Sequence, residues 1–230
     1  MRLLLIRHGQ TSSNVLGLLD TDAPGPSLTE LGDRQSKGIP DALAERNPEA
    51  IFISRLVRTH ETAVPLAEHL NLSGTVLGGL NEIEAGSLED LSDIASVHTY
   101  LTTAFAWAEG DMARRMPGGP DGHEFFSRFD AAIADVVATG VETAAVFSHG
   151  MAIRAWAAAR ASDIDGSYAA THELDNTGMV SLDSGEDGTW TLVEWRSTPL
   201  MGTAVADAEA LDPTARTLST LREPTEPTAP

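Results

Sequence analysis

Four short runs of mostly apolar residues are spaced along the chain, at positions 3–6, 50–54, 74–80 and 143–148. None of them alternates between apolar and polar residues. A continuous apolar run of this length is typical of a strand whose two faces are both buried, as in a parallel sheet. We therefore predict four buried strands at these positions.

Helical periodicity fills most of the sequence between these strands. It predicts helices over residues 29–44, 54–70, 92–109, 121–139 and 150–161. Ser27 followed by Glu30 fits a capping box at the start of the first helix. Pro65 predicts a kink in the second helix, because proline has no N–H to donate.

The last third of the chain changes character. Residues 178–183 and 189–195 predict a β-hairpin around a Ser-Gly-Glu-Asp-Gly turn. From residue 206 to 230 the sequence is rich in Thr, Glu, Asp and Pro, and we predict a disordered acidic tail there. The strands that alternate with helices predict an α/β fold, a three-layer α/β/α sandwich around a mostly parallel central sheet.

Functional sites in such sheets form beyond the carboxyl ends of the strands. Chemically active residues follow the four predicted strands at these ends: Arg7, His8 and Gly9; Arg55 and Arg58; Glu82; His149 and Gly150. We therefore expect two imidazoles, several guanidiniums and a carboxylate to meet at one edge of the sheet.

Composition narrows the possible partners and location. A length of 230 residues suits one α/β domain, although two small ones are also compatible. The formal net charge of −19 disfavours nucleic acid and anionic membranes as partners. Absence of cysteine excludes disulfides, thiolate metal sites and thiol nucleophiles. With no membrane-spanning run and no signal peptide in the sequence, we expect a cytoplasmic protein.

The residues at the sheet edge suit phosphoryl chemistry. An imidazole that faces two guanidiniums has a lowered pKa, so it is neutral and nucleophilic near pH 7. Arginine binds phosphoryl oxygens through two parallel N–H groups, and Glu82 suits the role of general acid and base. We expect no cofactor and no metal, since the other five histidines lack metal-ligand spacing: His60, His69, His98, His123 and His172.

Five blocks of sequence, in order, resemble the histidine phosphatase superfamily, which includes the cofactor-dependent phosphoglycerate mutases. The first is Arg-His-Gly-Gln-Thr-Ser-Ser-Asn at residues 7–14, and the others cover residues 27–36, 54–63, 80–90 and 147–150. The resemblance implies a phosphoglycerate mutase-like fold with a small helical cap. It also implies one histidine phosphatase domain over residues 1–205, with residues 94–121 as a cap insertion.

The same resemblance implies roles for individual residues. His8 would be the nucleophile that becomes phosphohistidine, and Glu82 would be the proton donor. Arg7, Arg58 and His149 would hold the phosphoryl group. The residues implied to contact the substrate are Gly9, Gln10, Thr11, Asn14 and Gly150.

The chain departs from the family pattern in the loop after Glu82. Ala85 stands where an aromatic residue is common, and residues 88–90 read Leu-Glu-Asp where Trp-Glu-Gly is common. Because such loops contact the substrate, these differences leave the substrate open and do not affect the core chemistry.

Several charged residues remain without an assigned role. Arg55 fits a surface position or a salt bridge, and Arg154 fits a structural ion pair as well as a ligand contact. Arg114 and Arg115 fit a solvated face better than a contact from the cap to an anionic substrate. We interpret Glu84 and Glu89 as surface carboxylates.

Three functions follow from these patterns. The first is hydrolysis of a small phosphorylated metabolite by a metal-independent phosphatase that uses phosphohistidine. The alternative is a phosphoglycerate mutase, an isomerase that returns the phosphoryl group to its substrate. The second alternative is a non-catalytic sensor of a phosphorylated ligand. A homodimer is compatible with the composition, which leaves the oligomeric state open.

Overall fold

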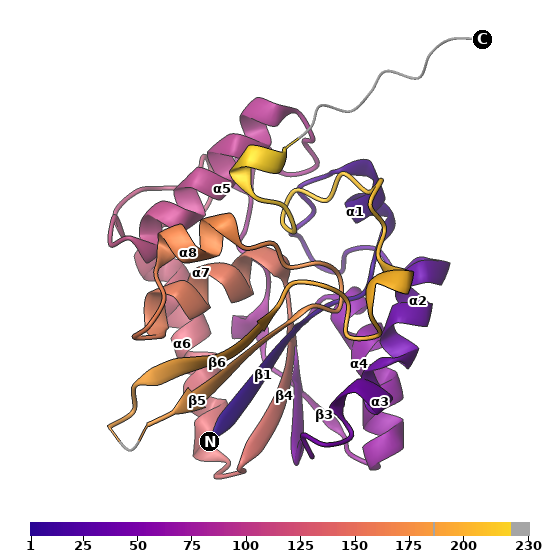
Figure 1. Cartoon of the computed structure of the whole chain (residues 1–230). Coiled ribbons are helices and arrows are strands. Elements are labelled where there is room, and N and C mark those ends of the chain that lie inside the picture. The colour runs from indigo at the N-terminus through magenta and orange to yellow at the C-terminus, as the bar shows by residue number, and fades with distance from the viewer. Residues whose placement is uncertain (186, 222–230) are drawn as a thin grey trace, which may run out of the picture.

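The computed structural model of the chain describes residues 1–185 and 187–221. A six-stranded sheet lies at its centre, with the strand order β3-β2-β4-β1-β5-β6 (Figure 1). The strands are β1 Arg2–Arg7, β2 Ala50–Ile53, β3 Gly74–Val76, β4 Thr143–Ser148, β5 Met179–Ser184 and β6 Trp190–Arg196.

Strands β1, β2, β3 and β4 are parallel to one another. The predicted hairpin is β5 and β6, which pair antiparallel, and β5 extends the sheet by pairing antiparallel with β1. The sheet is therefore mixed, with a parallel centre. The predicted α/β fold is confirmed, and β1 and β4 lie side by side so that the residues that follow them meet.

Helices and short 3₁₀ turns connect the strands. The helices are α1 Ser12–Leu16, α2 Glu30–Lys37, α3 Ile39–Leu43, α4 Val57–Leu70, α5 Ile94–Ala108, α6 Gly122–Ala138, α7 Gly150–Arg160 and α8 Gly166–Thr171. The turns are η1 Gly78–Leu80, η2 Gly86–Leu88, η3 Thr203–Val205 and η4 Leu218–Thr220. Among the described residues, no helix combines the length and apolar character needed to cross a bilayer.

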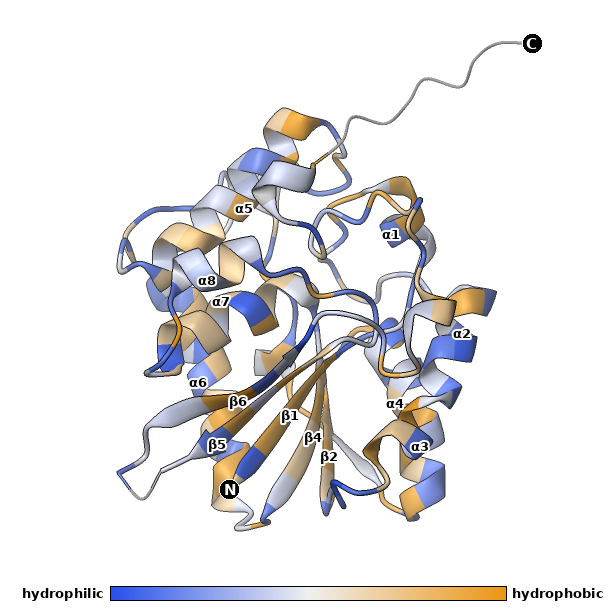
Figure 2. Ribbon diagram, in the orientation of Figure 1, coloured by the Kyte–Doolittle hydropathy of each residue, from blue (hydrophilic) through white to orange (hydrophobic). Residues whose placement is uncertain are grey.

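Apolar residues on both faces of the sheet explain why its central strands have no alternating pattern. Leu3 and Leu5 of β1 belong to the core cluster that includes residues of α5, α6, α7 and α8. Leu4 and Ile6 belong to a second cluster, shared with α3 and α4 on the other face. Figure 2 shows the apolar strands between these two helical layers. Because successive side chains of a strand point to opposite faces, each residue of the run is buried on one side or the other.

Two predicted elements are shorter or broken in the structure. The predicted strand over residues 74–80 ends at Val76, and Gly78–Leu80 forms η1. The predicted helix over residues 29–44 is interrupted at Gly38, and α3 begins just before Pro40. Proline has no N–H to donate to the preceding turn of a helix, so the first turn of a new helix is the position that it favours. Helix α4, by contrast, continues through Pro65.

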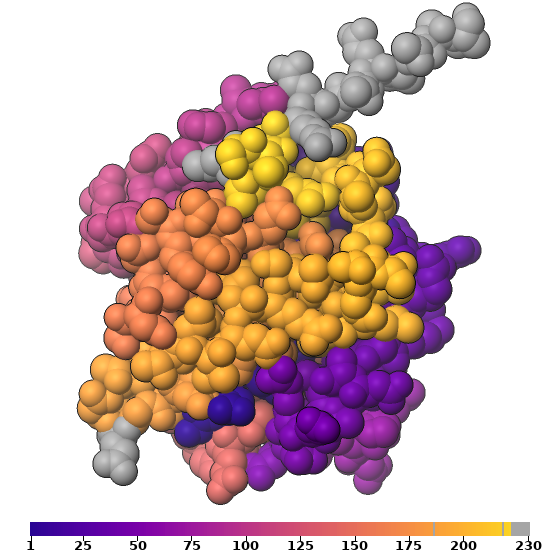
Figure 3. All heavy atoms as spheres, viewed as in Figure 1, coloured from indigo at the N-terminus to yellow at the C-terminus, as the bar shows by residue number. Residues whose placement is uncertain are grey.

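The predicted disordered tail needs correction for residues 206–221, which pack against the body of the protein. Ala210, Asp212 and Thr214 are buried. Figure 3 shows the gold and yellow atoms of this segment in contact with the rest of the molecule over a broad area. Composition alone could not show this, because the surface that receives the segment is assembled from distant elements. The rest of the predicted tail, residues 222–230, lies outside the described residues.

Candidate active site

A pocket lies at the carboxyl-end edge of the sheet, next to β1, which is one of the central strands. It is lined by His8, Thr11, Ser13, Asn14, Leu18, Asp20, Arg58, Glu82 and Thr214. Five of these nine are predicted site residues, which come from β1, α1, α4 and the loop after η1. The edge of the sheet therefore brings these five together, whereas Arg7 and His149, which were also predicted for the site, are not among the residues that line the pocket.

His8 is held so that one ring nitrogen remains available. Its Nδ1 lies 2.8 Å from the carbonyl oxygen of Gly9. A carbonyl can only accept a hydrogen bond, so Nδ1 carries the proton and the lone pair lies on Nε2. The backbone N–H of His8 also donates to the carbonyl of Ser148 at 3.1 Å, which ties the residue to the end of β4.

Both imidazoles of the site are buried, and their ring centroids are 5.2 Å apart. Burial lowers the pKa of His8 well below its ordinary value, and the positive charges of Arg58 and Arg7 lower it further. The pKa of His149 is also lowered, by burial first and then by Arg58. The predicted charge repulsion is present, but burial is the larger cause. Both rings are neutral near pH 7.

Three nitrogens of the predicted phosphoryl-binding residues are buried and lack a hydrogen-bond partner among the described residues. They are Nε of Arg7, Nε of Arg58 and Nδ1 of His149. His149 Nε2 lies 2.8 Å from the hydroxyl of Ser54, and in the tautomer that accepts from this hydroxyl the ring proton is on Nδ1. Buried N–H groups without a partner are costly, so this arrangement favours a ligand that supplies oxygen acceptors.

Arg58 is fixed at the pocket by the loop that precedes α2. Its Nη2 donates to the backbone carbonyl of Asp20 at 2.9 Å, and its Nη1 lies 3.4 Å from the Asp20 carboxylate. These contacts hold the outer edge of the guanidinium and leave Nε on the inner edge. Burial lowers the pKa of Arg58, although the nearby charge of Asp20 opposes this effect.

Glu82 lies at the N-terminus of α7. Its Oε1 accepts from the backbone N–H groups of Ile83 and Ala152, each at 2.8 Å, and its Oε2 accepts from Met151 at 3.1 Å. Burial nevertheless raises the pKa of the carboxyl group above its ordinary value, against these three donors. A carboxyl group with a raised pKa retains its proton to higher pH, as a general acid requires.

Asn14 and Thr11 line the pocket together, because Thr11 caps the short helix that carries Asn14. Asn14 Oδ1 accepts from the Thr11 N–H at 2.9 Å and from Asn176 Nδ2 at 3.1 Å. These bonds orient the amide and leave its Nδ2 without a protein acceptor within residues 1–185 and 187–221.

The other three predicted substrate contacts do not line the pocket. The Gly9 N–H donates to the hydroxyl of Thr62 at 2.9 Å. Gly9 is required because a Cβ there would lie 2.8 Å from the carbonyl oxygen of Gly32. A Cβ on Gly150 would lie 2.9 Å from Arg7 Nε. Both glycines therefore permit close packing behind the site.

Gln10 also has a structural position. Its Oε1 accepts from the hydroxyl of Thr29 at 2.8 Å, and its Nε2 donates to Asp207 at 2.8 Å. The side chain thus joins the start of α2 to the C-terminal segment, and its predicted contact with substrate is not present in the pocket lining.

Four residues of the pocket were not predicted from the sequence: Ser13, Leu18, Asp20 and Thr214. Ser13 donates to Asp20 at 2.5 Å, in the same loop that contacts Arg58. A carboxylate in a Pro/Gly-rich loop after the first motif was a weak signal for Asp20. Thr214 had none, since it lies in the segment predicted to be disordered.

Arg128 of α6 supports the loop that carries Glu82. Its Nη1 donates to the carbonyls of Gly79 and Asn81 at 2.8 and 2.9 Å, and its Nη2 donates to the carbonyl of Glu82 at 2.5 Å. It also forms a 3.2 Å salt bridge with Glu84. Glu84 is therefore a surface carboxylate, as interpreted from the sequence, that also takes part in this support.

Three of the other charged residues without an assigned role lie on the surface. Arg55 and Arg114 are exposed. Arg115 is exposed and pairs with Asp121 and Glu124, in agreement with a solvated face.

Glu89 and Arg154 both differ from their predicted surroundings. Glu89 is half-buried and not freely solvated: it accepts from the backbone N–H of Thr21 at 2.6 Å and anchors the loop around Asp20. Arg154 is fully buried and donates to the backbone carbonyls of Thr214, Arg216 and Ala169 at 2.9–3.0 Å. Among the described residues it forms no salt bridge with a carboxylate, and it does not line the pocket.

The donors that surround His8 suit an anion. Guanidinium and imidazole N–H groups bind oxygen anions, whereas a metal ion needs lone pairs from several ligands. Within residues 1–185 and 187–221, no group of three or more His, Cys, Asp or Glu side chains is placed to hold a metal.

Comparison with known proteins finds matches over most of the chain. The model of the histidine phosphatase superfamily (branch 1) matches residues 3–198. The chain is 38% identical over 211 residues to the PE-PGRS family protein PE_PGRS11 of Mycobacterium tuberculosis, which covers 85% of this chain. It is 33% identical over 128 residues to the adenosylcobalamin/alpha-ribazole phosphatase of Salmonella typhimurium, which covers 56% of this chain.

A solved structure of a mycobacterial glucosyl-3-phosphoglycerate phosphatase in complex with VO3 is similar in fold. It superimposes with a TM-score of 0.70 at 29% identity and covers 85% of this chain and 98% of that one. The two sequence relatives are longer than the matched region. This chain spans 36% of the first and 62% of the second, less than two thirds of either.

Proposed function

The chain belongs to the histidine phosphatase superfamily, and from that premise we propose that it hydrolyses small phosphomonoesters through a phosphohistidine on His8. The observation that carries this proposal is one pocket lined by the imidazole of His8, the buried carboxyl group of Glu82 and Arg58, with Arg7 and His149 buried next to His8 and each with a nitrogen that lacks a partner among the described residues. Relatives that are named as phosphatases support it.

In the first half of the reaction, His8 Nε2 attacks the phosphorus atom. The P–N bond forms as the P–O bond to the alcohol breaks, and Glu82 gives its proton to the departing oxygen. Arg7, Arg58 and His149 donate to the non-bridging oxygens of the phosphoryl group. Because these donors are already in position, they stabilise the negative charge on these oxygens in the transition state.

In the second half, water attacks the phosphorus atom of the phosphohistidine. Glu82, now a carboxylate, accepts a proton from this water, and the electron pair of the P–N bond returns to His8 Nε2. Phosphate leaves and both residues regain their starting forms. No step is assigned to a metal, because the guanidiniums of Arg7 and Arg58 supply the positive charge that phosphoryl transfer needs.

Charge around the pocket favours hydrolysis of esters of uncharged alcohols over the mutase reaction. A phosphoglycerate carries a carboxylate as well as its phosphate, and holding it requires a further cation. Among the described residues that line the pocket, Arg58 is the single cation, and Asp20 already pairs with it. A carboxylate on the substrate would therefore face the carboxylate of Asp20 and find no further cation in the pocket lining.

We also propose that one catalytic domain begins at residue 1 and extends past the predicted boundary at residue 205 to include the packed residues 206–221, with residues 94–121 as its cap. Supporting this, Ile94 and Val97 at the start of α5 line a second pocket beside the first, together with Gly17, which neighbours the active-site residue Leu18. The cap thus borders the space that the leaving alcohol would enter.

A screen of purified protein against phosphate esters tests the proposed function. We expect phosphate release from several monoesters, no loss of activity with EDTA, and little interconversion of 3- and 2-phosphoglycerate. Efficient interconversion would identify a mutase instead. Phosphate binding without turnover of any ester would identify a sensor.

Replacement of Arg128 by methionine is expected to lower kcat by about 10- to 100-fold. The guanidinium donates hydrogen bonds to the carbonyls of Gly79 and Glu82, and without them the loop that carries Glu82 is held less rigidly. Steady-state kinetics on a monoester measure this change. Arg115→Met is the matched control, since its partners lie on the exposed face. Equal effects of both variants would contradict the assigned role of Arg128.

A further inference from the structure

Arg7 is held from behind by the C-terminal segment. Its Nη2 donates to the Asp212 carboxylate at 2.7 Å and to the Thr214 hydroxyl at 2.9 Å, and its Nη1 donates to the carbonyl of Leu174 at 2.8 Å. Arg7 is fully buried, and Asp212 and Thr214 are 3% and 9% exposed. Both Asp212 and Thr214 lie beyond the region that matches the family model, residues 3–198.

These contacts engage the two terminal nitrogens and leave Nε, the remaining donor, without a partner among the described residues. A guanidinium is planar, so fixing its terminal nitrogens also fixes the direction of Nε–H. Thr214 additionally lines the pocket that contains His8 and Arg58. The segment thus contacts both the outer edge of Arg7 and the space where the phosphoryl group would lie.

Gly150, at the start of α7, lies against both Arg7 and Thr214. A Cβ at this position would lie 2.9 Å from Arg7 Nε and also 2.9 Å from the carbonyl and hydroxyl oxygens of Thr214. The glycine that follows His149 therefore gives room for Arg7 and the C-terminal segment to meet.

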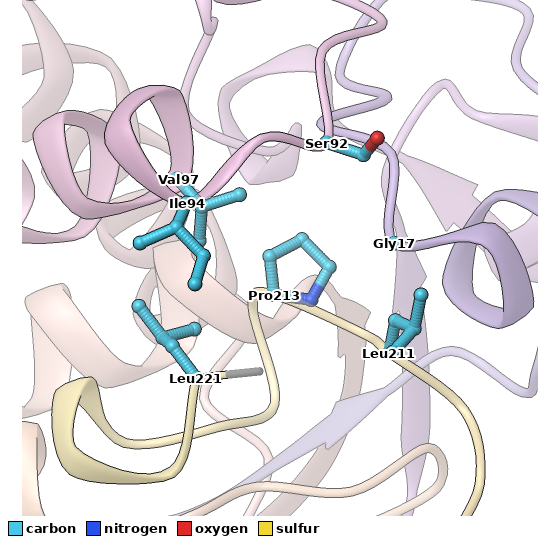
Figure 4. Close-up of a pocket in the computed structure, with 7 residues that line it drawn as sticks. All are labelled: Gly17, Ser92, Ile94, Val97, Leu211, Pro213 and Leu221. Carbon is cyan, nitrogen blue, oxygen red and sulfur yellow. The ribbon is translucent and has the colours of Figure 1, made fainter. Parts of the chain in front are cut away.

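The segment is anchored on both sides of Asp212. The backbone N–H of Asp212 donates to the carbonyl of Asn14 at 3.0 Å. Figure 4 shows Leu211 and Pro213, which flank Asp212, at a pocket that they share with Gly17 and with Ile94 and Val97 of α5.

Further along the segment, Arg154 donates to the carbonyl of Thr214 at 2.9 Å and to that of Arg216 at 3.0 Å. The N–H of Leu174 donates to the carbonyl of Ala215 at 3.0 Å. Asp212 and Thr214 are therefore placed by the fold and not by a free tail.

We propose that Asp212 and Thr214 are positioning residues of the active site, which orient Arg7 so that its Nε–H meets a non-bridging phosphoryl oxygen. This inference rests on the proposed function. Charge-assisted bonds to a buried guanidinium are short and directional, and removal of one partner leaves a buried charge without its counter-ion. Arg7 would then be misplaced at the phosphoryl group although the nucleophile is intact.

The test compares Asp212→Ala, Asp212→Asn and Thr214→Val with Glu209→Gln, an exposed carboxylate of the same segment. We expect Asp212→Ala to lower kcat/KM by about 10- to 100-fold and to weaken competitive inhibition by inorganic phosphate by at least about tenfold. Asp212→Asn and Thr214→Val keep more of the contacts to Arg7. Both should lower kcat/KM and weaken phosphate inhibition less than Asp212→Ala does, and Thr214→Val should have the smaller effect of the two. Glu209→Gln should change neither quantity by more than about twofold.

Inhibition by phosphate separates positioning from a general structural role. A structural role would lower the melting temperature while folded protein keeps its normal inhibition constant. Unchanged or tighter phosphate inhibition in Asp212→Asn and Thr214→Val would overturn the proposal, and tighter inhibition would mean that Asp212 competes with phosphate for Arg7. If the wild-type protein neither hydrolyses esters nor binds phosphate, the proposed function itself fails.

Discussion

Replacement of His8 by alanine is expected to reduce kcat by about 10⁴-fold or more, the range found when an enzyme loses its nucleophile. The side chain is buried in the pocket, with Nδ1 bound to the carbonyl of Gly9 and Nε2 left to attack. Without Nε2 no P–N bond forms, and the remaining donors can only stabilise direct attack by water. Steady-state kinetics on a monoester measure the loss.

Trapping of the intermediate adds a direct test. Wild-type protein that is quenched during turnover should carry a phosphoryl group that is stable in base and labile in acid, as expected of phosphohistidine. His8→Ala should carry none, while His98→Ala, an exposed histidine of α5, should behave as wild type. Turnover by His8→Ala within about tenfold of wild type would contradict the proposed nucleophile.

Replacement of Glu82 by glutamine is expected to lower kcat by about 10²- to 10⁴-fold with alkyl phosphates, the usual contribution of a general acid. The effect on the first half of the reaction should be smaller with an aryl ester such as 4-nitrophenyl phosphate, whose leaving oxygen needs little protonation. Attack by water still requires a base, so the variant should release a burst of nitrophenol and accumulate phosphohistidine. Rapid-quench kinetics measure the burst.

The pH profile of kcat/KM gives a second readout of Glu82. Its pKa is raised by burial, and its protonated form is the active acid, so activity should fall as pH rises through this raised value. The pKa of His8 is lowered by burial and by Arg58, so the imidazole remains neutral and active until the pH falls well below its ordinary value. Activity should therefore be highest between these two limits, and Glu82→Gln should lose the decline on the basic side.

Asp90→Asn is the matched control for Glu82→Gln, since Asp90 lies in the same loop with an exposed side chain. Its backbone has a positive φ of 59°, which asparagine also tolerates. We expect kcat within about twofold of wild type. An equal loss in both variants, or an unchanged basic limb in Glu82→Gln, would contradict the role assigned to Glu82.

Part of the candidate site was predictable because His8 and His149 directly follow the strands β1 and β4. A run of buried apolar residues shows where a strand ends, and parallel strands end at one edge of the sheet. His8 and His149 could therefore be placed near one another without a structure, whereas Glu82 follows η1 and not the end of β3. Family resemblance then distinguished Arg58 from Arg55, which the helical spacing alone left equivalent.

Contacts made behind the site could not be predicted in this way. The positions of Gly9, Gln10 and Gly150 in the motifs suggested contact with substrate, whereas the structure uses all three to pack neighbouring segments together. Motif position does not reveal whether a residue faces the ligand or the protein. Arg128 and Asp212 lacked even a motif, because their partners are backbone carbonyls and a guanidinium far away in the sequence.

By itself the sequence determined the α/β fold, the family and the four segments that bring His8, Arg58, Glu82 and His149 together, since these follow from local patterns of apolar and polar residues. Only the tertiary structure decided which atoms remain free at the site and which segment completes it. Residues 206–221 show the difference: their composition is typical of a disordered tail, but the folded protein offers them buried partners such as Arg7 and Arg154. Such partners arise from elements distant in the sequence, so a local pattern cannot contain them.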